Sequence, residues 1–396
     1  MKTLLILTVL LTIFGSTFQQ QGKSVEDLIK EIFIDGMLDT KNPAVTPRNP
    51  DAGCVCVPYY LCKNDSTINT DGVGIIDIRI DENQGECSSY LQFCCIPPNV
   101  VDKPIVPKPD PLLPVQSGCG YRHEDGVGFR ITGDEDSEAK FGEFPWMVAI
   151  LREERMDGQD ETLNVYQCGG TLIHPKVVIT AAHCVSDRQK TFKVRAGEWD
   201  TQTKNEIYAH QDRAVKSWTI HPEYYAGALF NDIAVLILEE PFIIADNVDV
   251  ACLPKQSEVI PEGTRCFASG WGKDVFGKEG KYQVILKKIE LPIVERNKCE
   301  TSLRTTRLGA FFKLHNSFIC AGGEAGKDTC KGDGGSPLVC PIPGLKGRYQ
   351  HAGIVAWGIG CGENNVPGVY ANVGLFRDWI DAEVKKHGID PASYTY

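Results

Sequence analysis

Three short segments of the sequence contain residue types that serve nucleophilic hydrolysis. That chemistry needs a nucleophile such as a hydroxyl, a base within hydrogen-bonding distance of it, and a third group that orients the base. A histidine, His183, stands in Thr-Ala-Ala-His-Cys at residues 180–184, and an acid, Asp232, stands in Asn-Asp-Ile-Ala-Val-Leu at residues 231–236. The third segment, residues 332–337, reads Gly-Asp-Gly-Gly-Ser-Pro. The chain thus presents a base, an acid and a glycine-rich loop, in that order.

The three segments resemble those around the catalytic triad of chymotrypsin-like serine proteases. Gly-Trp-Gly at residues 270–272 and Pro-Gly-Val-Tyr at residues 367–370 are in register with the same family. The resemblance covers about two thirds of the chain, from near Cys119 to the expected C-terminal helix. It implies an all-β fold, a chymotrypsin-like double β-barrel with a C-terminal helix.

At Gly334 the sequence departs from the family pattern, and this difference decides the expected function. The family loop reads Gly-Asp-Ser-Gly-Gly-Pro, so Gly334 takes the position of the nucleophilic serine and has nothing to deprotonate. Ser336 is two residues further along, and a misplacement of roughly 1 Å is already costly. Removing the nucleophile of a triad typically lowers turnover by about 10⁶. We therefore expect His183, Asp232 and Gly334 to be a non-functional triad, in agreement with Ala356 where active relatives carry serine.

The resemblance also implies a trypsin-like specificity pocket. Asp328 matches the acid at its floor, and Gly358 and Gly368 match its open walls. This pocket either captures an arginine or lysine side chain without cutting it or is idle. Backbone N–H groups of Gly332 and Gly334 would still offer an oxyanion pocket, because that needs no side chain.

The elements that must position these residues are predominantly strands. Short β-branched or alternating runs, punctuated by glycine and proline, occur at residues 176–180, 192–196, 233–238 and 353–357. Such a pattern is typical of β-sandwiches and barrels. Apolar residues from Leu375 to Val384, before Gly388, recur at helical spacing and predict one closing helix.

Composition limits the partners and the compartment. The chain has 396 residues, sixteen cysteines and a formal net charge of −11. Its negative balance, without a long block of like charge, argues against nucleic acid and membrane surfaces as partners. Residues 1–18 have a basic start and an apolar run, Leu4–Phe14, that is too short to span a bilayer. They predict a secretory signal peptide, and hence a secreted protein with mostly paired cysteines.

Three regions precede the protease-like domain, which we assign to residues 131–396. Within residues 19–53, apolar residues recur at helical spacing from Val25 to Phe33 and predict an amphipathic helix for docking or self-association, or for packing on its own protein. Residues 54–95 hold six cysteines and predict a disulfide-stapled module, because so short a stretch cannot be stabilised by core burial alone. Residues 96–130 are proline-rich and predict a semi-rigid linker.

The stapled module resembles an arthropod clip domain, and the whole arrangement resembles the clip-domain serine protease homologues. That family implies a non-catalytic cofactor of innate immunity, secreted into haemolymph. An upstream clip-domain protease would cut it, and it would then self-associate and help convert prophenoloxidase into active phenoloxidase for melanisation. Two alternatives stay open: residual hydrolysis through Ser336 or His183, and a decoy or microbial-surface recognition protein that uses the cleft or the clip groove.

Two arginines are candidate processing sites. The family commonly has a site inside the clip domain, where we prefer Arg79. Arg130, which precedes Ile131, resembles the activation cut of active relatives, with Asp333 as the partner of the new N-terminus.

The family also implies how the cysteines pair. The expected disulfides are Cys54–Cys94, Cys56–Cys87, Cys62–Cys95, Cys119–Cys252, Cys168–Cys184, Cys266–Cys340, Cys299–Cys320 and Cys330–Cys361.

Two further features concern modification and metal. Asn64 begins an Asn-Asp-Ser sequon in the clip loop and is expected to be glycosylated. Glu198 and Glu206 flank a loop that in trypsin-like relatives can hold Ca²⁺ through carboxylates and carbonyls, the alternative being solvated surface acids. Apart from a structural Ca²⁺ we expect no cofactor.

Overall fold

A computed structural model describes most of the second half of the chain and parts of the first. The described residues are 55–58, 77–78, 92–95, 118–127, 130–131, 137–155, 162–201, 206, 208–272, 283–326, 333–359 and 363–396. The signal peptide, the helix expected near residue 25, the Asn64 sequon and Arg79 lie outside them.

The secondary structure in this part of the chain is mainly β. The strands are β1 (Val55–Pro58), β2 (Asp77–Ile78), β3 (Gln92–Cys95), β4 (Arg130–Ile131), β5 (Met147–Arg155), β6 (Thr162–His174), β7 (Val177–Thr180), β8 (Phe192–Ala196), β9 (Gln211–Ile220), β10 (Ala234–Leu238), β11 (Arg265–Gly270), β12 (Lys287–Val294), β13 (Phe318–Gly322), β14 (Pro337–Pro341), β15 (Tyr349–Trp357) and β16 (Pro367–Asn372). The helices are η2 (Ala182–Val185), α4 (Arg296–Arg304), η3 (Val373–Phe376), α5 (Arg377–Lys386) and η4 (Pro391–Tyr394).

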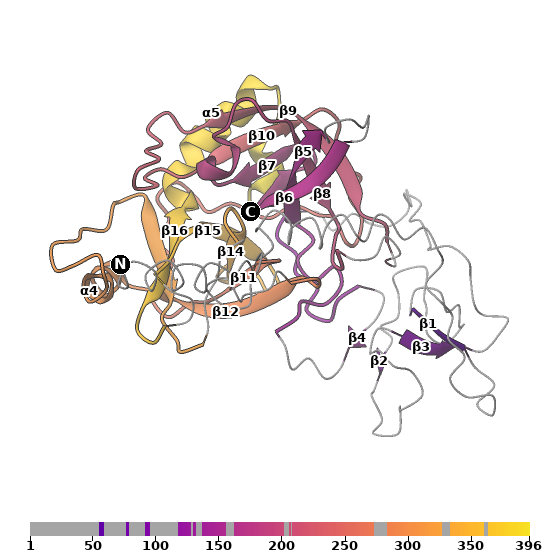
Figure 1. The fold of residues 1–396 in the computed structure, drawn as a ribbon, viewed down its shortest axis with the longest axis horizontal. Coiled ribbons are helices and arrows are strands. Elements are labelled where there is room, and N and C mark those ends of the chain that lie inside the picture. The colour runs from indigo at the N-terminus through magenta and orange to yellow at the C-terminus, as the bar shows by residue number, and fades with distance from the viewer. Residues whose placement is uncertain are drawn as a thin grey trace, which may run out of the picture.

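Twelve of these strands form two closed antiparallel barrels. The first has the order β10-β7-β6-β5-β8-β9 and the second the order β11-β12-β13-β16-β15-β14. Figure 1 shows the two barrels one above the other, with α5 beside the upper, first barrel. The predicted double β-barrel with a C-terminal helix is therefore confirmed.

Burial on both faces explains why two strands of the first barrel appear in the sequence as unbroken apolar runs. Every residue of β7 and of β10 is buried. The outer side of this barrel is covered by the C-terminal helix α5, whose Ile380 and Val384 belong to the same core cluster. A strand that is covered on both sides has no polar face to alternate with its apolar one.

Helix α4 was not predicted, because its sequence carries little periodic signal. Only Cys299 and Leu303 of this helix are buried. It is held instead by an N-cap, since the carboxylate of Glu295 accepts hydrogen bonds from the backbone N–H groups of Asn297 and Lys298.

Four of the expected disulfides are present and join distant segments of this domain. They are Cys119–Cys252, Cys168–Cys184, Cys266–Cys340 and Cys299–Cys320. The Cys330–Cys361 pair and the three clip pairs involve residues whose side chains lie outside the description.

The N-terminal half contributes two small sheets. Strands β1 and β3 pair antiparallel, with Cys56 opposite Cys94. Strands β2 and β4 pair in parallel, with Asp77 opposite Arg130, so one candidate processing site lies in a β-ladder. No helix in the described part of the chain is long and apolar enough to cross a membrane.

Candidate functional site

His183 and Asp232 form a hydrogen-bonded pair at the end of the first barrel. His183 lies on η2, three residues after strand β7 ends, and Asp232 lies two residues before β10 begins. The two strands pair with each other, so they bring the two side chains together. His183 Nδ1 is 2.7 Å from Asp232 Oδ2, and the backbone N–H of His183 donates to Asp232 Oδ1 at 2.9 Å. Asp232 is completely buried, whereas the His183 side chain is 30% exposed.

Gly334 lies directly against the other ring nitrogen of His183. A Cβ atom at Gly334 would be 2.9 Å from His183 Nε2 and 3.4 Å from Cε1. The loop is fixed in this place by its neighbours, since the Gly334 carbonyl accepts from Gly169 N–H at 3.0 Å and Gly335 has a φ of 79°. The predicted base, acid and glycine loop are thus brought together, and the imidazole faces a residue with no side chain.

Ser336 does not reach this site. Its side chain is completely buried, and its Oγ lies beneath the backbone of Gly169, where a Cβ would come within 2.1 Å of it. The Ser336 N–H donates to the Asp333 carbonyl, which folds the loop into a turn and carries the hydroxyl away from the cleft. Hydrolysis through Ser336 therefore has no support in this geometry.

Asp333 and the two glycines predicted for the specificity pocket lie in the second half of the domain. The Asp333 carboxylate accepts from the Gly272 N–H at 2.9 Å. Gly358 directly follows β15, and Gly368 lies in the adjacent strand β16. Asp328 and Gly332 lie outside the described residues, so the floor of the pocket and the oxyanion donors remain predictions.

The two acids of the expected calcium loop lie together with a histidine. Glu198, Glu206 and His210 each offer a ligand atom, and these atoms are within 4.8 Å of one another. Burial and the neighbouring Glu198 carboxylate raise the pKa of Glu206 well above its ordinary value. Glu198 also pairs with the guanidinium of Arg195, at 3.0 Å. These acids are therefore not the solvated surface acids of the alternative prediction.

The donor set fits a hard cation only in part. Glu206 Oε2 is buried without a hydrogen-bond partner among the described residues, which leaves an oxygen atom for a ligand. Arg195 and His210 compete with a cation for Glu198. A metal here would take Glu206 first and would have to displace one of these neighbours from Glu198.

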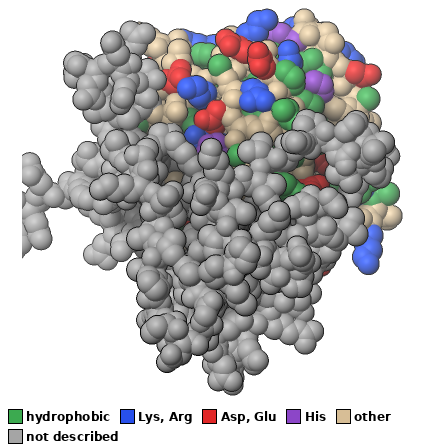
Figure 2. Space-filling model, turned by 90° about the vertical axis from the view of Figure 1, so that its right-hand side faces the viewer, with side chains coloured by type: hydrophobic (Ala, Val, Ile, Leu, Met, Phe, Trp, Pro, Cys, Tyr) green, Lys and Arg blue, Asp and Glu red, His purple; other side chains and the backbone are tan. Residues whose placement is uncertain are grey.

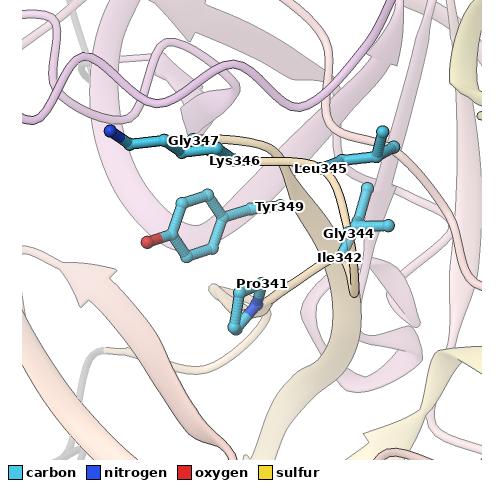
Figure 3. A pocket seen from close by; sticks show the side chains of 7 residues that line it. All are labelled: Pro341, Ile342, Gly344, Leu345, Lys346, Gly347 and Tyr349. Carbon is cyan, nitrogen blue, oxygen red and sulfur yellow. The ribbon is translucent and has the colours of Figure 1, made fainter.

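A pocket of about 400 Å³ lies away from the His183–Asp232 pair, in the β14–β15 hairpin. Figure 3 shows Tyr349 and Pro341 facing this space from the two sides of the hairpin. It contains none of the predicted site residues.

One cluster of aromatic side chains was not predicted from the sequence. Phe312 and Phe318 both pack edge-on against Trp357, with ring centroids 6.1 and 5.8 Å apart. Phe230 stacks on His315 at 4.1 Å. Only tertiary structure brings them together, because they come from three separate stretches of sequence.

Comparison with known families agrees with this geometry. The family model described as Trypsin matches residues 134–380, and the model described as Serine protease Clip domain PPAF-2 matches residues 43–96. The chain belongs to the trypsin family, as a clip-domain serine protease homologue. The family predicted from the three triad segments is thereby confirmed.

Relatives of this trypsin-family chain include proteins named for phenoloxidase activation and for lost activity. "Phenoloxidase-activating factor 2" of Galleria mellonella is 62% identical over 298 residues, which are 74% of this chain and 98% of that protein. "Inactive CLIP domain-containing serine protease A8" of Anopheles gambiae is 37% identical and covers 84% of this chain and 89% of its own length. "Inactive CLIP domain-containing serine protease A3" of Aedes aegypti is 40% identical over 84% of this chain and 67% of its own length. These names support a protease-homologue role in the prophenoloxidase pathway.

Proposed function

We propose that this chain is a catalytically inactive serine protease homologue that acts as a protein cofactor for prophenoloxidase activation. The observation that supports it most is the contact between Gly334 and His183. The base and its orienting acid are in place, but no side chain can be deprotonated at the position that faces the base. A covalent acyl intermediate therefore has no atom on which to form.

The remaining scaffold is suited to binding. Four disulfides and two closed barrels hold the described part of the domain together around the His183–Asp232 pair. A rigid protein surface can position prophenoloxidase or its activating protease without any chemistry of its own. The disulfides also fit secretion into an oxidising compartment such as haemolymph.

Processing would switch the cofactor on. An upstream clip-domain protease would cut after Arg79, and the processed chain would self-associate. Arg130 is paired in the β2–β4 ladder, and Asp77 and Ile78 of the partner strand directly precede Arg79, so this ladder does not favour one site over the other.

The test is reconstitution from purified components. Prophenoloxidase and its activating protease are mixed with the native chain, with Arg79→Ala, or with buffer, and phenoloxidase activity is followed while the chain is checked for nicking. We expect activity only with the native chain, nicked after Arg79. Arg130→Ala is the matched control and should behave like the native chain. Equal activity with buffer and with native chain would remove the cofactor role and favour the decoy or recognition function, which binding to bacteria or peptidoglycan would then measure.

A burst assay tests the absence of catalysis separately. The processed chain is mixed with an arginine ester in amounts that would reveal one equivalent of released alcohol. We expect no burst, and a burst of one equivalent would show that the chain is an enzyme.

A further inference from the structure

The loop between α4 and β13 presents an aromatic side chain to solvent in a basic surrounding. Phe311 is 97% exposed, more than any other large apolar residue in the described part of the chain. Between residues 301 and 323 the sequence has three cations, Arg304, Arg307 and Lys313, and no aspartate or glutamate. This local charge is opposite in sign to the net charge of −11 of the whole chain.

The loop is held rigidly in this position. Arg304 Nε donates to the Phe312 carbonyl at 2.8 Å, and the Leu314 N–H donates to Glu300 Oε2 at 2.9 Å. The disulfide Cys299–Cys320 ties the helix before the loop to the strand after it. Phe311 is therefore displayed by a braced loop, which lowers the entropy cost of burying it against a partner.

Phe312, the residue after Phe311, belongs to a packed cluster of aromatic side chains. Phe312 packs against Trp357, and Phe318 against both Trp357 and Phe230. Tyr225, which is 60% exposed, extends this aromatic cluster, because its ring centroid lies 5.9 Å from that of Phe230. An exposed aromatic that continues into a packed aromatic cluster has the composition of an interface core.

The charges around Phe311 show which kind of partner fits. Arg304 pairs with Glu300 within α4, whereas Arg307 and Lys313 form no ion pair with any described residue. By contrast, the face drawn in Figure 2 mixes Lys and Arg with Asp and Glu where its residues are described. We call Arg307, Phe311, Phe312 and Lys313 the Phe311 surface. It fits an acidic segment that carries apolar side chains.

One segment of this chain has that chemistry and has no other assigned role. Residues 24–40 contain five acidic residues and one lysine. The same stretch has apolar residues at helical spacing from Val25 to Phe33. An amphipathic helix of this composition can place its apolar face on exposed aromatics while its acids meet the surrounding cations.

We propose that residues 24–40 of one copy dock on the Phe311 surface of a second copy. This inference rests on the self-association included in the proposed function, and it names the two surfaces that make the contact. Each copy carries both partners, so the contact can repeat from one molecule to the next.

The test measures association of the full-length chain by sedimentation velocity, before and after processing at Arg79. We expect Phe311→Ala to weaken self-association at least tenfold, and Arg307→Glu with Lys313→Glu to abolish it. Adding Glu26→Lys and Glu31→Lys to that charge-reversed chain should restore association, because the two charge patterns again oppose each other. Val259→Ala is the matched control, since Val259 is also exposed, at 84%, but lies on another loop.

Each other outcome overturns the proposal. A monomer in both the native and the processed form, or association that survives the Phe311-surface variants, removes this surface as the contact. Association that is lost with charge reversal and not restored by the compensating reversal excludes residues 24–40 as the occupant. Since the readout is sedimentation and not phenoloxidase activity, such a result leaves the cofactor function to its own test.

Discussion

His351 makes this domain sensitive to acid. It is the third residue of β15, is completely buried, and neither ring nitrogen has a well-formed hydrogen bond to a described residue. Burial disfavours the charged form and lowers the pKa of His351 to about 3. In the unfolded chain the same imidazole has a pKa of about 6.5.

The sign and size of the effect follow from linkage. Between the two pKa values the unfolded chain binds a proton that the folded chain does not bind, so acid favours unfolding. The stability associated with neutral His351 is fully present above about pH 6.5 and is lost as the pH falls toward 3. Because one pKa unit corresponds to about 1.4 kcal/mol, lowering the pH from 7 to 5 should cost about 2 kcal/mol through this one residue.

The assay compares urea unfolding of the native chain and His351→Leu at pH 7 and at pH 5. The comparison with a variant is needed because other groups titrate too. Asp249, for example, has its pKa raised to about 6 by burial, so it acts in the opposite direction. We expect the native chain to lose about 2 kcal/mol more than the variant does between the two pH values. The leucine variant should be at least as stable as the native chain at pH 7, because it buries no unsatisfied nitrogen. Equal losses in the two proteins would refute the reasoning.

Three further predictions concern the site and its supports. The Gly334→Ser variant should hydrolyse an arginine ester at least about 100-fold more slowly than an active trypsin-family protease does, because the Cβ of the new serine would lie 2.9 Å from His183 Nε2 and force the base out of place. Activity near that of the active protease would contradict this prediction. Calcium at ten times its dissociation constant should stabilise the native chain by about 1.4 kcal/mol, which raises the melting temperature by roughly 4 °C. Glu206→Gln should remove that stabilisation, and a melting temperature that calcium does not change in the native chain would rule the site out. Arg122→Ala should lower the free energy of unfolding, measured by denaturant titration, by about 3 kcal/mol, because it leaves the completely buried Glu143 carboxylate with fewer cationic partners. A change below about 0.5 kcal/mol would mean that Lys288, 2.9 Å from the same carboxylate, is enough to stabilise its charge.

Much of the fold was accessible from sequence because it is carried by local patterns. The runs at residues 192–196 and 233–238 correspond to β8 and β10, and the closing helix corresponds to α5. The triad segments are short and contiguous, so their residues could be named in advance. The four disulfides found came from resemblance to a family, since spacing alone allows many pairings.

What the sequence could not predict depends on contacts between distant segments. Phe230 and Trp357 both pack on Phe318, although Phe230 precedes β10 of the first barrel and the other two lie in strands of the second barrel, so they meet only when the two barrels pack together. The unpartnered burial of His351 leaves no local signal, because one polar residue in a strand is usually on the exposed face. Helix α4 begins at a residue whose N-terminal neighbour, Glu295, caps it with a side-chain carboxylate, and apolar periodicity does not reveal such a cap.

The His183–Asp232 pair does not need catalysis to explain its presence. Asp232 is completely buried and accepts two hydrogen bonds from the same residue, one from the His183 backbone and one from its ring. Without the imidazole, Asp232 Oδ2 would lose its hydrogen-bond partner in a place from which water is excluded, and a buried polar group left without a partner costs about 1–3 kcal/mol. The ring of His183 therefore stabilises the fold at the same point at which an active protease would use it as a base. A chain that has glycine in place of the nucleophile still gains stability from the other two members of the triad, so their geometry is no measure of activity. Activity depends on the third position, where Gly334 offers only a backbone.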